Sequence, residues 1–526
     1  MNSVLLRFGV LCAGAPALTV VQRLTIRKLL DTGDTEFAVL VILQGLPTSP
    51  DRRSVAVPEF GSVPRLSCST MRDSAGYRHL PSTATLSIGE HRPDFLLDFT
   101  GAPLGGGILD VPIHGVWSFS HTVKPEDSLS IVTLLRLRNP PGSATALTSC
   151  IVRAEPVSRQ VQRNAAMSAA ADLPARICKV LLGGRAESLF ALTTPNFSVP
   201  GDPSRWRQML SVLAVGRDWV AAQLQAVLFV ETWNAGIVNA PICRFLEPGF
   251  RPVITWIPSR GPHKFIADPF AVAGANGIEL FVEEFDHNRY QGYIGSTRWT
   301  PGRQPEWELR IDEGVHMSYP YPVQHGGKLY VVPESSLNGE VALYACESAA
   351  GRWKKVATLI EDFAAIDSTL IQYDGRWWLF CTCREDFPDS KLYLWHAPDL
   401  FGPWSPHRMN PVKCDIRSSR PGGTPFVHEE ALYRPAQDSS KSYGGALTIN
   451  RIVSLTLDEF REEPVVHLEP FRDSPYPHGV HTLSAAGSIT VLDGKRMAFL
   501  PRLSARRLRH KLMRAGEILF RRRAIS

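Results

Sequence analysis

A strand, a Gly-containing turn and a second strand recur five times in the second half of the chain, and this repetition constrains the fold more than any other feature. The five units begin at Ala267, Ser318, Ile366, Gly422 and His481. Their turns lie roughly 50 to 65 residues apart, which is the length of chain that a four-stranded propeller blade consumes. The sequence therefore predicts a five-bladed β-propeller over 251–500, with an irregular β-sandwich as the alternative.

Two dipeptides predict where hairpins turn. Asp374-Gly375 and Asp493-Gly494 both suit tight turns that need a positive φ, and alternating apolar residues flank them. The first strand of each propeller blade lines the central channel, so residues at the starts of the five units should converge although they lie far apart in the sequence. The channel is therefore the predicted functional site.

Polar side chains stand near the starts of these units. Asp268 lies in the first unit, Asp367 in the third, Arg420 just before the fourth and His481 in the fifth, while Glu334 ends the hairpin of the second. Carboxylates that face one channel are what glycosidic chemistry requires, one as acid and one as base or nucleophile. Either aspartate also suits a purely structural role as a turn residue that caps backbone N–H groups.

Over about 250 residues the propeller resembles the N-terminal domain of plant glucosamine inositolphosphorylceramide transferases, which is related to five-bladed glycosidases such as arabinanases and β-xylosidases. The stretches that carry the resemblance are IADPF, SYPYPV with VPES, AIDSTLI with DGRWWLF, NPVKCDIRSSRPGG, YRPAQD with YGGAL, and HGVHTLS. The resemblance implies a carbohydrate ligand in the channel and a part in glycan or glycolipid assembly.

The glycosidases use an Asp of the first blade as base, an Asp of the third as a partner that orients and tunes, and a Glu of the fourth as acid. Asp268 and Asp367 match the first two, whereas the fourth unit offers no obvious acid and Glu334 sits on another blade. We assign Asp268, Asp367 and Glu334 to the catalytic set of an alternative glycosidase or glycosyl-transfer function. The residues assigned to binding a sugar or sugar phosphate are Arg420, Arg434, Gln437, Asp438, Tyr443 and His481.

The first half of the chain predicts a separate α/β domain over 1–185. An apolar strand near the N-terminus, a helical stretch from Thr19 and the apolar segment FAVLVILQG form a strand-helix-strand unit of a parallel sheet. The segments PDFLLDFTG and HGVWSFSH predict two more buried strands. Although the first residues resemble a short signal peptide, Arg7 interrupts the apolar run, and a buried strand is the better interpretation.

This domain resembles the formyltransferase fold of methionyl-tRNA and sugar-amine formyltransferases, most closely over DFLLDFTGAPLGGGILDVPIHGVWSFSH. That family activates the attacking amine with an Asn, a His and an Asp. The matching positions here are Ser118, Ser120 and Gly142, so the resemblance implies a degenerate site without formyl transfer. An amino-sugar formyltransferase, with His121 and Asp127 as a rearranged acid-base pair, remains a further alternative.

The remaining segments are a predicted linker with an apolar helix over 186–250 and a basic tail over 501–526. The stretch WNAGIVNAPICRFL in the linker predicts the strand that closes the propeller ring. Between Arg502 and Arg523 the tail holds nine Lys or Arg and one acid, against +6 for the whole chain. It predicts an amphipathic helix that either lies on an anionic membrane surface or packs on the propeller.

Composition narrows the remaining classes. The body of the chain lacks a basic face with interleaved aromatics, so no nucleic-acid partner is expected. Nine scattered cysteines indicate free thiols and a cytoplasmic protein, and no spacing suggests a metal site or a cofactor. The partner we predict is a sugar, sugar phosphate or glycolipid, with a membrane surface as the second partner of the tail.

Overall fold

The computed structural model describes residues 5–14, 17–46, 55–56, 60, 63–155, 157–185, 229–261, 263–274, 277–300, 302–346, 353–500 and 503. The chain divides into two compact units, Met1–Arg207 and Gln208–Ser526. The predicted apolar helix runs from Trp206 to about Val230; it lies outside the described residues except for its last two, which begin β12, and the basic tail lies outside them except for Leu503. No helix within these described ranges is both long and apolar enough to cross a bilayer.

The first unit is an α/β domain built on a seven-stranded sheet in the order β11-β10-β9-β8-β1-β3-β5. The strands β1, β3, β5, β8 and β9 pair in parallel, whereas β10 and β11 form an antiparallel edge. The strands are β1 (Leu6–Ala13), β3 (Thr35–Gln44), β5 (Arg65–Ser69), β8 (Phe95–Asp98), β9 (Val116–Lys124), β10 (Leu129–Arg138) and β11 (Ser143–Arg153). The helices are α1 (Val20–Leu30), α2 (Ser82–Glu90), α3 (Arg159–Ala169) and α4 (Leu173–Leu182).

The predicted strand-helix-strand unit is confirmed as β1, α1 and β3, and the two further strands as β8 and β9. Helix α1 begins at a capping box in which the Thr19 hydroxyl accepts from the Gln22 backbone N–H and the Gln22 side chain accepts from the Thr19 backbone. Strand β1 is almost wholly buried because it pairs with parallel neighbours on both sides. The N-terminal segment is thus a central strand of this sheet.

The second unit is a propeller of five sheets, and all five predicted hairpins are the two inner strands of a blade. The first blade is β14 (Lys264–Gly274), β15 (Gly277–Asp286), β16 (Gln291–Trp299) and β17 (Trp307–Ile311). The second is β18 (Ser318–His325), β19 (Lys328–Glu334), β20 (Val341–Cys346) and β21 (Trp353–Ile360). The third is β22 (Ala365–Tyr373), β23 (Arg376–Cys383), β24 (Lys391–Ala397) and β25 (Ser405–Pro406), with β26 (Lys413–Cys414) beside β24. The fourth is β27 (Phe426–His428), β28 (Ala431–Asp438), β29 (Ala446–Leu455) and β30 (Phe460–Leu468).

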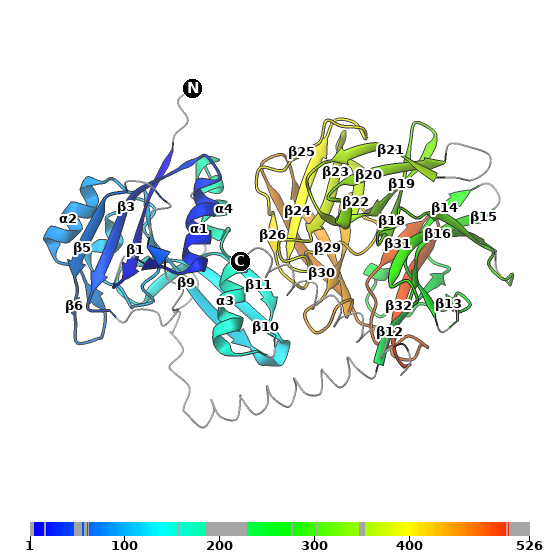
Figure 1. Cartoon of the computed structure of the whole chain (residues 1–526), viewed down its shortest axis with the longest axis horizontal. Helices are drawn as coiled ribbons and strands as arrows, with labels where there is room; N and C mark the ends of the chain where they lie inside the picture. Colours follow the sequence, from blue (N-terminus) through cyan, green and yellow to red (C-terminus); the bar gives the residue numbers. More distant parts are fainter. Residues whose placement is uncertain are drawn as a thin grey trace, which may run out of the picture. The chain divides into compact units, whose positions relative to one another are not determined.

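The fifth blade closes the ring with strands from the two ends of the unit (Figure 1). Its inner strands are β31 (Leu483–Ala486) and β32 (Ile489–Phe499), and its outer strands are β12 (Phe229–Val238) and β13 (Ile254–Trp256). Ten residues of β12 pair antiparallel with β32, from Phe229 opposite Phe499 to Val238 opposite Thr490. This confirms the prediction that the segment around Trp233 closes the ring, so residues 229–246 of the expected linker belong to the propeller.

One of the two predicted hairpin turns is confirmed and the other is wrong. Asp374 and Gly375 both have positive φ, at 50° and 70°, between β22 and β23. In the fifth blade, Gly487 makes the turn with a φ of 62°. Asp493 instead lies inside β32 and is fully buried, and its carboxylate accepts the backbone N–H groups of His481 and Thr482, just before β31.

Candidate functional site

Three neighbouring blades begin with the same local distortion. The β-ladder shifts register between Ala267 and Phe270, between Ser318 and Tyr321, and between Ile366 and Thr369. The residues inside these bulges with positive φ are Asp268 (49°), Tyr319 (47°) and Asp367 (54°). A bulge re-aims a side chain and lets a non-glycine residue hold this sparsely populated conformation. Both predicted aspartates are therefore positioned by the repeat itself.

Asp268 is nine-tenths buried and joins three blades. Its Oδ1 accepts from the Thr482 hydroxyl at 2.9 Å, and its Oδ2 accepts from the Tyr319 backbone N–H at 3.2 Å. His481 Nε2 lies 3.5 Å from Oδ1. Burial, opposed by the His481 charge and reinforced by the Asp367 carboxylate, raises the pKa of Asp268 to about 6.

Asp367 has its own set of donors. Its Oδ2 accepts from Arg420 Nε at 2.6 Å and from Gln437 Nε2 at 2.8 Å. Arg420 also donates from Nη1 to Asp389 at 3.0 Å. Burial raises the pKa of Asp367 to about 6 although the Arg420 charge opposes it, and the nearby Glu334 raises it further. Arg420 is thus already paired with carboxylates rather than held ready for an anionic ligand.

His481 forms a buried ion pair with Asp493. Its Nδ1 contacts Asp493 Oδ2, and its ring stacks on Trp233 with centroids 4.0 Å apart. Asp493 Oδ1 accepts from the backbone N–H groups of His481 and Thr482 at 2.9 and 3.1 Å. Burial alone would lower the pKa of His481, but the charges of Asp493 and Asp268 outweigh it and raise that pKa. The imidazole therefore favours its protonated form beside Asp268.

Two further carboxylates occupy equivalent places on second strands. Glu283 pairs with Ala267, and Glu334 pairs with Ser318, each next to a bulge. Burial raises the pKa of Glu283 well above its usual value, and the neighbouring carboxylates add to this effect. Glu334 accepts a hydrogen bond from Ser336 at 2.8 Å. The channel thus gathers five buried carboxylates around two cationic side chains, Arg420 and His481.

Two buried polar atoms beside Asp367 have no hydrogen-bond partner within the described residues. They are Gln437 Oε1 and Thr382 Oγ1, both on second strands of their blades. Gln437 donates to Asp367, and Thr382 lies opposite Ile366, the residue before Asp367. Buried polar groups are normally paired, so a hydroxyl-bearing ligand or an ordered water is the expected partner here.

Three of these residues also have the geometry to hold a cation. One ligand atom each from Asp268, His481 and Asp493 lies within 4.8 Å of the other two. Carboxylate oxygens with an imidazole nitrogen suit several divalent ions. A bound cation would replace the direct His481–Asp493 contact. The sequence did not indicate this group because Asp268 lies more than 200 residues from the other two members.

Two of the predicted binding residues lie away from the channel cluster. Arg434 is fully buried and donates to Glu462 from Nε at 2.9 Å and from Nη2 at 2.6 Å. Its guanidinium also donates to the carbonyls of Ser418 and Ser419, in the loop that ends at Arg420. That Arg434 contacts a ligand stays a prediction, and its guanidinium is fully buried and paired with Glu462. Asp438 faces a separate pocket instead of Asp367.

The remaining predicted residues meet in the channel. Tyr443 lies with its ring 5.1 Å from the Arg420 guanidinium and 5.6 Å from the His481 ring. The structure thus brings together Asp268, Asp367, Glu334, Arg420, Gln437, Tyr443 and His481.

Comparison with known proteins gives a match over most of the propeller. Residues 248–473 match the family model of glucosamine inositolphosphorylceramide transferase 1, N-terminal. The propeller matches this N-terminal domain family. Over 273 residues the chain is 34% identical to glucosamine inositolphosphorylceramide transferase 1 of Oryza sativa subsp. japonica, covering 48% of this chain and 36% of the relative. The same-named protein of Arabidopsis thaliana is 30% identical over 270 residues, covering 48% and 35%. The chain thus spans about a third of the length of these curated relatives.

Among solved structures, a family 117 glycoside hydrolase of the marine bacterium Zobellia galactanivorans is 16% identical with a TM-score of 0.33. The match covers 44% of this chain and 85% of that chain. The family resemblance expected for the propeller is confirmed. The formyltransferase resemblance of the first unit stays a prediction.

Sequence reasoning missed four residues of the glucosamine inositolphosphorylceramide transferase-like channel: Glu283, Tyr319, Thr382 and Asp493. The signal for Tyr319 was its place in the repeat, since ADPF, SYPY and IDST put Asp268, Tyr319 and Asp367 at one position. Glu283 and Glu334 likewise close equivalent second strands. Asp493 gave the opposite signal, because an Asp-Gly pair predicts a turn.

Proposed function

We propose that the propeller channel binds a carbohydrate and that the protein acts in the assembly of a glycan or glycolipid. The observation that carries the proposal is the pair of bulge aspartates, Asp268 and Asp367, buried side by side with raised pKa values beside the unpartnered acceptor of Gln437. Carboxylates and amide oxygens placed in this way accept hydrogen bonds from sugar hydroxyls. The named function of the matched relatives supports the same ligand class.

A glycosidase or glycosyl-transfer reaction is the second candidate, and the protonation states favour it. A carboxyl with a pKa of about 6 suits a general acid or base near neutral pH, and Asp268 and Asp367 both have that value. Glu334, the third residue of the predicted catalytic set, accepts a hydrogen bond from Ser336. Glu283 is the better proton donor on chemical grounds, because burial and the neighbouring carboxylates raise its pKa and so favour its protonated form.

For the first unit we propose a scaffold that transfers no formyl group. Ser118 is the third residue of β9 and lies opposite Asp98, the last residue of β8, to which its hydroxyl donates at 3.1 Å. Gly142 occupies the turn between β10 and β11 with a φ of 91°, a conformation that an Asp side chain rarely adopts. We also propose that the protein is cytoplasmic and that its basic tail, over 501–526, lies on an anionic membrane surface.

Ligand-observed NMR of the full chain tests the channel with a panel of glycosides, amino sugars, sugar nucleotides and inositol phosphates. We expect at least one sugar to bind the wild type and to lose its signal with Asp268→Asn/Asp367→Asn, because the amides cannot accept the same hydrogen bonds. Asp399→Asn is the matched control, since its half-exposed carboxylate lies outside the channel, where it contacts His325 and accepts from the Phe401 backbone N–H. Equal binding by both variants, or no binding to the wild type, would contradict the proposal.

A further inference from the structure

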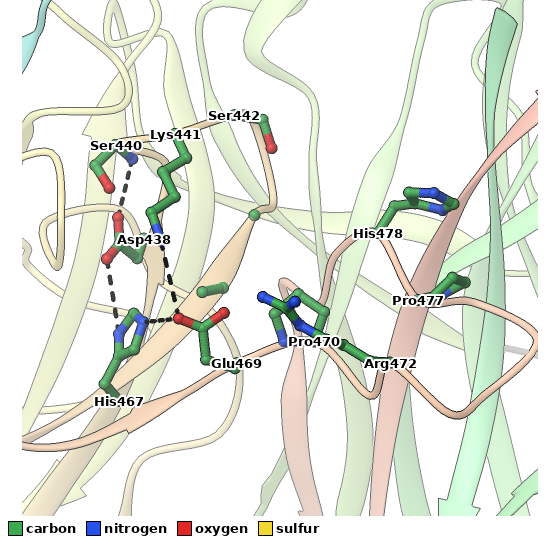
Figure 2. A pocket seen from close by; sticks show the side chains of 12 residues that line it. Asp438, Ser440, Lys441, Ser442, His467, Glu469, Pro470, Arg472, Pro477 and His478 are labelled. Carbon is green, nitrogen blue, oxygen red and sulfur yellow. Dashed lines mark hydrogen bonds and ion pairs between the residues drawn. The ribbon is translucent and has the colours of Figure 1, made fainter. Parts of the chain in front are cut away.

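The fourth blade carries a second polar site outside the channel. A pocket of about 390 Å³ lies between the end of β28, the loop that follows it, β30 and the chain segment from Glu469 to His478 (Figure 2). Gln437 and Asp438 are consecutive residues of β28, and successive side chains of a strand point to opposite faces. Gln437 donates to Asp367 in the channel, so Asp438 faces the pocket.

One wall of the pocket is a chain of paired polar groups. Asp438 Oδ1 accepts from the Ser440 backbone N–H at 2.9 Å, and Asp438 Oδ2 lies 3.7 Å from His467 Nδ1. His467 Nε2 lies 3.2 Å from Glu469 Oε1, and Lys441 Nζ lies 4.0 Å from the same oxygen. The two carboxylates are therefore fixed in position, and their other oxygen lone pairs are suited to accept hydroxyl groups.

The opposite wall carries an uncommitted positive charge. Arg472 is exposed, and its side chain makes no ion pair or hydrogen bond with any described residue. Beside it, His478 accepts from the Met497 backbone N–H through Nδ1 at 3.4 Å, which leaves Nε2–H as a donor. Figure 2 shows Arg472 and His478 across the pocket from His467 and Asp438. A guanidinium with a neighbouring donor matches a carboxylate or phosphate.

We infer that this pocket binds a single sugar residue that bears an anionic group, either a phosphate or a carboxylate. The anion contacts Arg472, and the sugar hydroxyls donate to Glu469 and Asp438 on the wall that also carries Lys441. The volume lies at the low end of ligand pockets, roughly 300 to 1,000 Å³, which suits one sugar ring rather than a chain of them. Few apolar side chains line the pocket, so a lipid tail is not accommodated there.

Isothermal titration calorimetry of the full chain tests this site with glucose 6-phosphate, glucuronate, glucose and inorganic phosphate. We expect one or both anionic sugars to bind the wild type, and about tenfold or more weaker binding to Arg472→Gln/Lys441→Gln, because charge-assisted hydrogen bonds are lost. Which of the two anionic sugars binds identifies the phosphate or the carboxylate as the recognised group. Arg461→Gln is the matched control, an exposed arginine of β30 outside the pocket.

The channel variant Asp268→Asn/Asp367→Asn separates the two sites. Unchanged binding of the anionic sugar by that variant supports a site independent of the channel. The inference is overturned if the channel variant abolishes the signal, if the pocket variant binds as the wild type does, or if none of the four probes binds. The inference is also overturned if glucose binds with the same affinity as the anionic sugars. It is overturned as well if inorganic phosphate alone binds equally tightly, because the pocket would then hold an adventitious ion only.

Discussion

Glu462→Gln is expected to lower the free energy of unfolding of the propeller by about 3 to 5 kcal/mol, the usual effect of breaking a buried ion pair from one side. Glu462 Oε1 accepts from Arg434 Nη2 at 2.6 Å and from Lys413 Nζ at 2.7 Å. The Arg434 and Glu462 side chains are 0% and 1% exposed. The variant leaves the guanidinium buried without a counter-charge. Because Arg434 also holds the loop that ends at Arg420, the channel should lose order with it.

The neighbouring Glu463→Gln provides the matched control. Glu463 pairs with Arg451 across β29 and β30, but both side chains are nearly half exposed, and such surface pairs contribute only about 0 to 1 kcal/mol. The unfolding free energy of both variants is measured by urea unfolding of the full chain, with hydrogen exchange read out in peptides from β28 to β30. A loss from Glu462→Gln no greater than that from Glu463→Gln would show that the buried pair is energetically neutral.

Asp268→Asn is expected to gain stability relative to the wild type as the pH rises from 4 to 7.5. Folding raises the pKa of Asp268 from its ordinary 3.8 to about 6. The folded state therefore binds this proton more tightly, so the contribution of Asp268 to stability is present at low pH and is lost as the pH rises through about 6. A shift of about two units corresponds to about 3 kcal/mol, which the neutral Asn does not lose.

The measurement is the difference in unfolding free energy between variant and wild type at the two pH values. The difference cancels the pH effects of groups that do not interact with Asp268, whereas His481 and Glu283, whose pKa values depend on the Asp268 charge, contribute to the difference as well. Asp399→Asn, on an exposed turn, serves as the control that should show no such trend. If the difference stays constant with pH, then Asp268 titrates as an ordinary carboxyl and the acid-base candidate loses its main support.

The propeller was predictable from sequence because its signals are local and repeated. Each inner hairpin carries alternating apolar strands around a Gly-containing turn, and five repeats at blade spacing fix both the fold and the channel. The positions of Asp268 and Asp367 followed from the repeat alone. The closing strand around Trp233 was recognisable because the fifth unit supplied only two strands of a four-stranded blade.

The residues that the sequence did not place are those whose role depends on partners in other segments of the propeller. From the sequence alone Arg434 resembles a ligand-binding residue, because its ion-pair partner Glu462 lies 28 residues further along the chain, on β30. Asp493 resembles a turn residue in the sequence because a glycine follows it, whereas in the structure it forms an ion pair with His481. Asp438 differs from Gln437 only in strand face, and a one-residue difference in facing decides which site a side chain serves.

The pairing of β12 with β32 places the beginning and the end of the propeller against each other. Phe229 lies opposite Phe499, with ring centroids 5.8 Å apart. The chain therefore enters and leaves the propeller at the same end of two paired strands in the middle of one blade. Because its two ends are adjacent, the domain is suited to insertion into a longer polypeptide. Removing either β12 or β32 would leave the other strand without its partner.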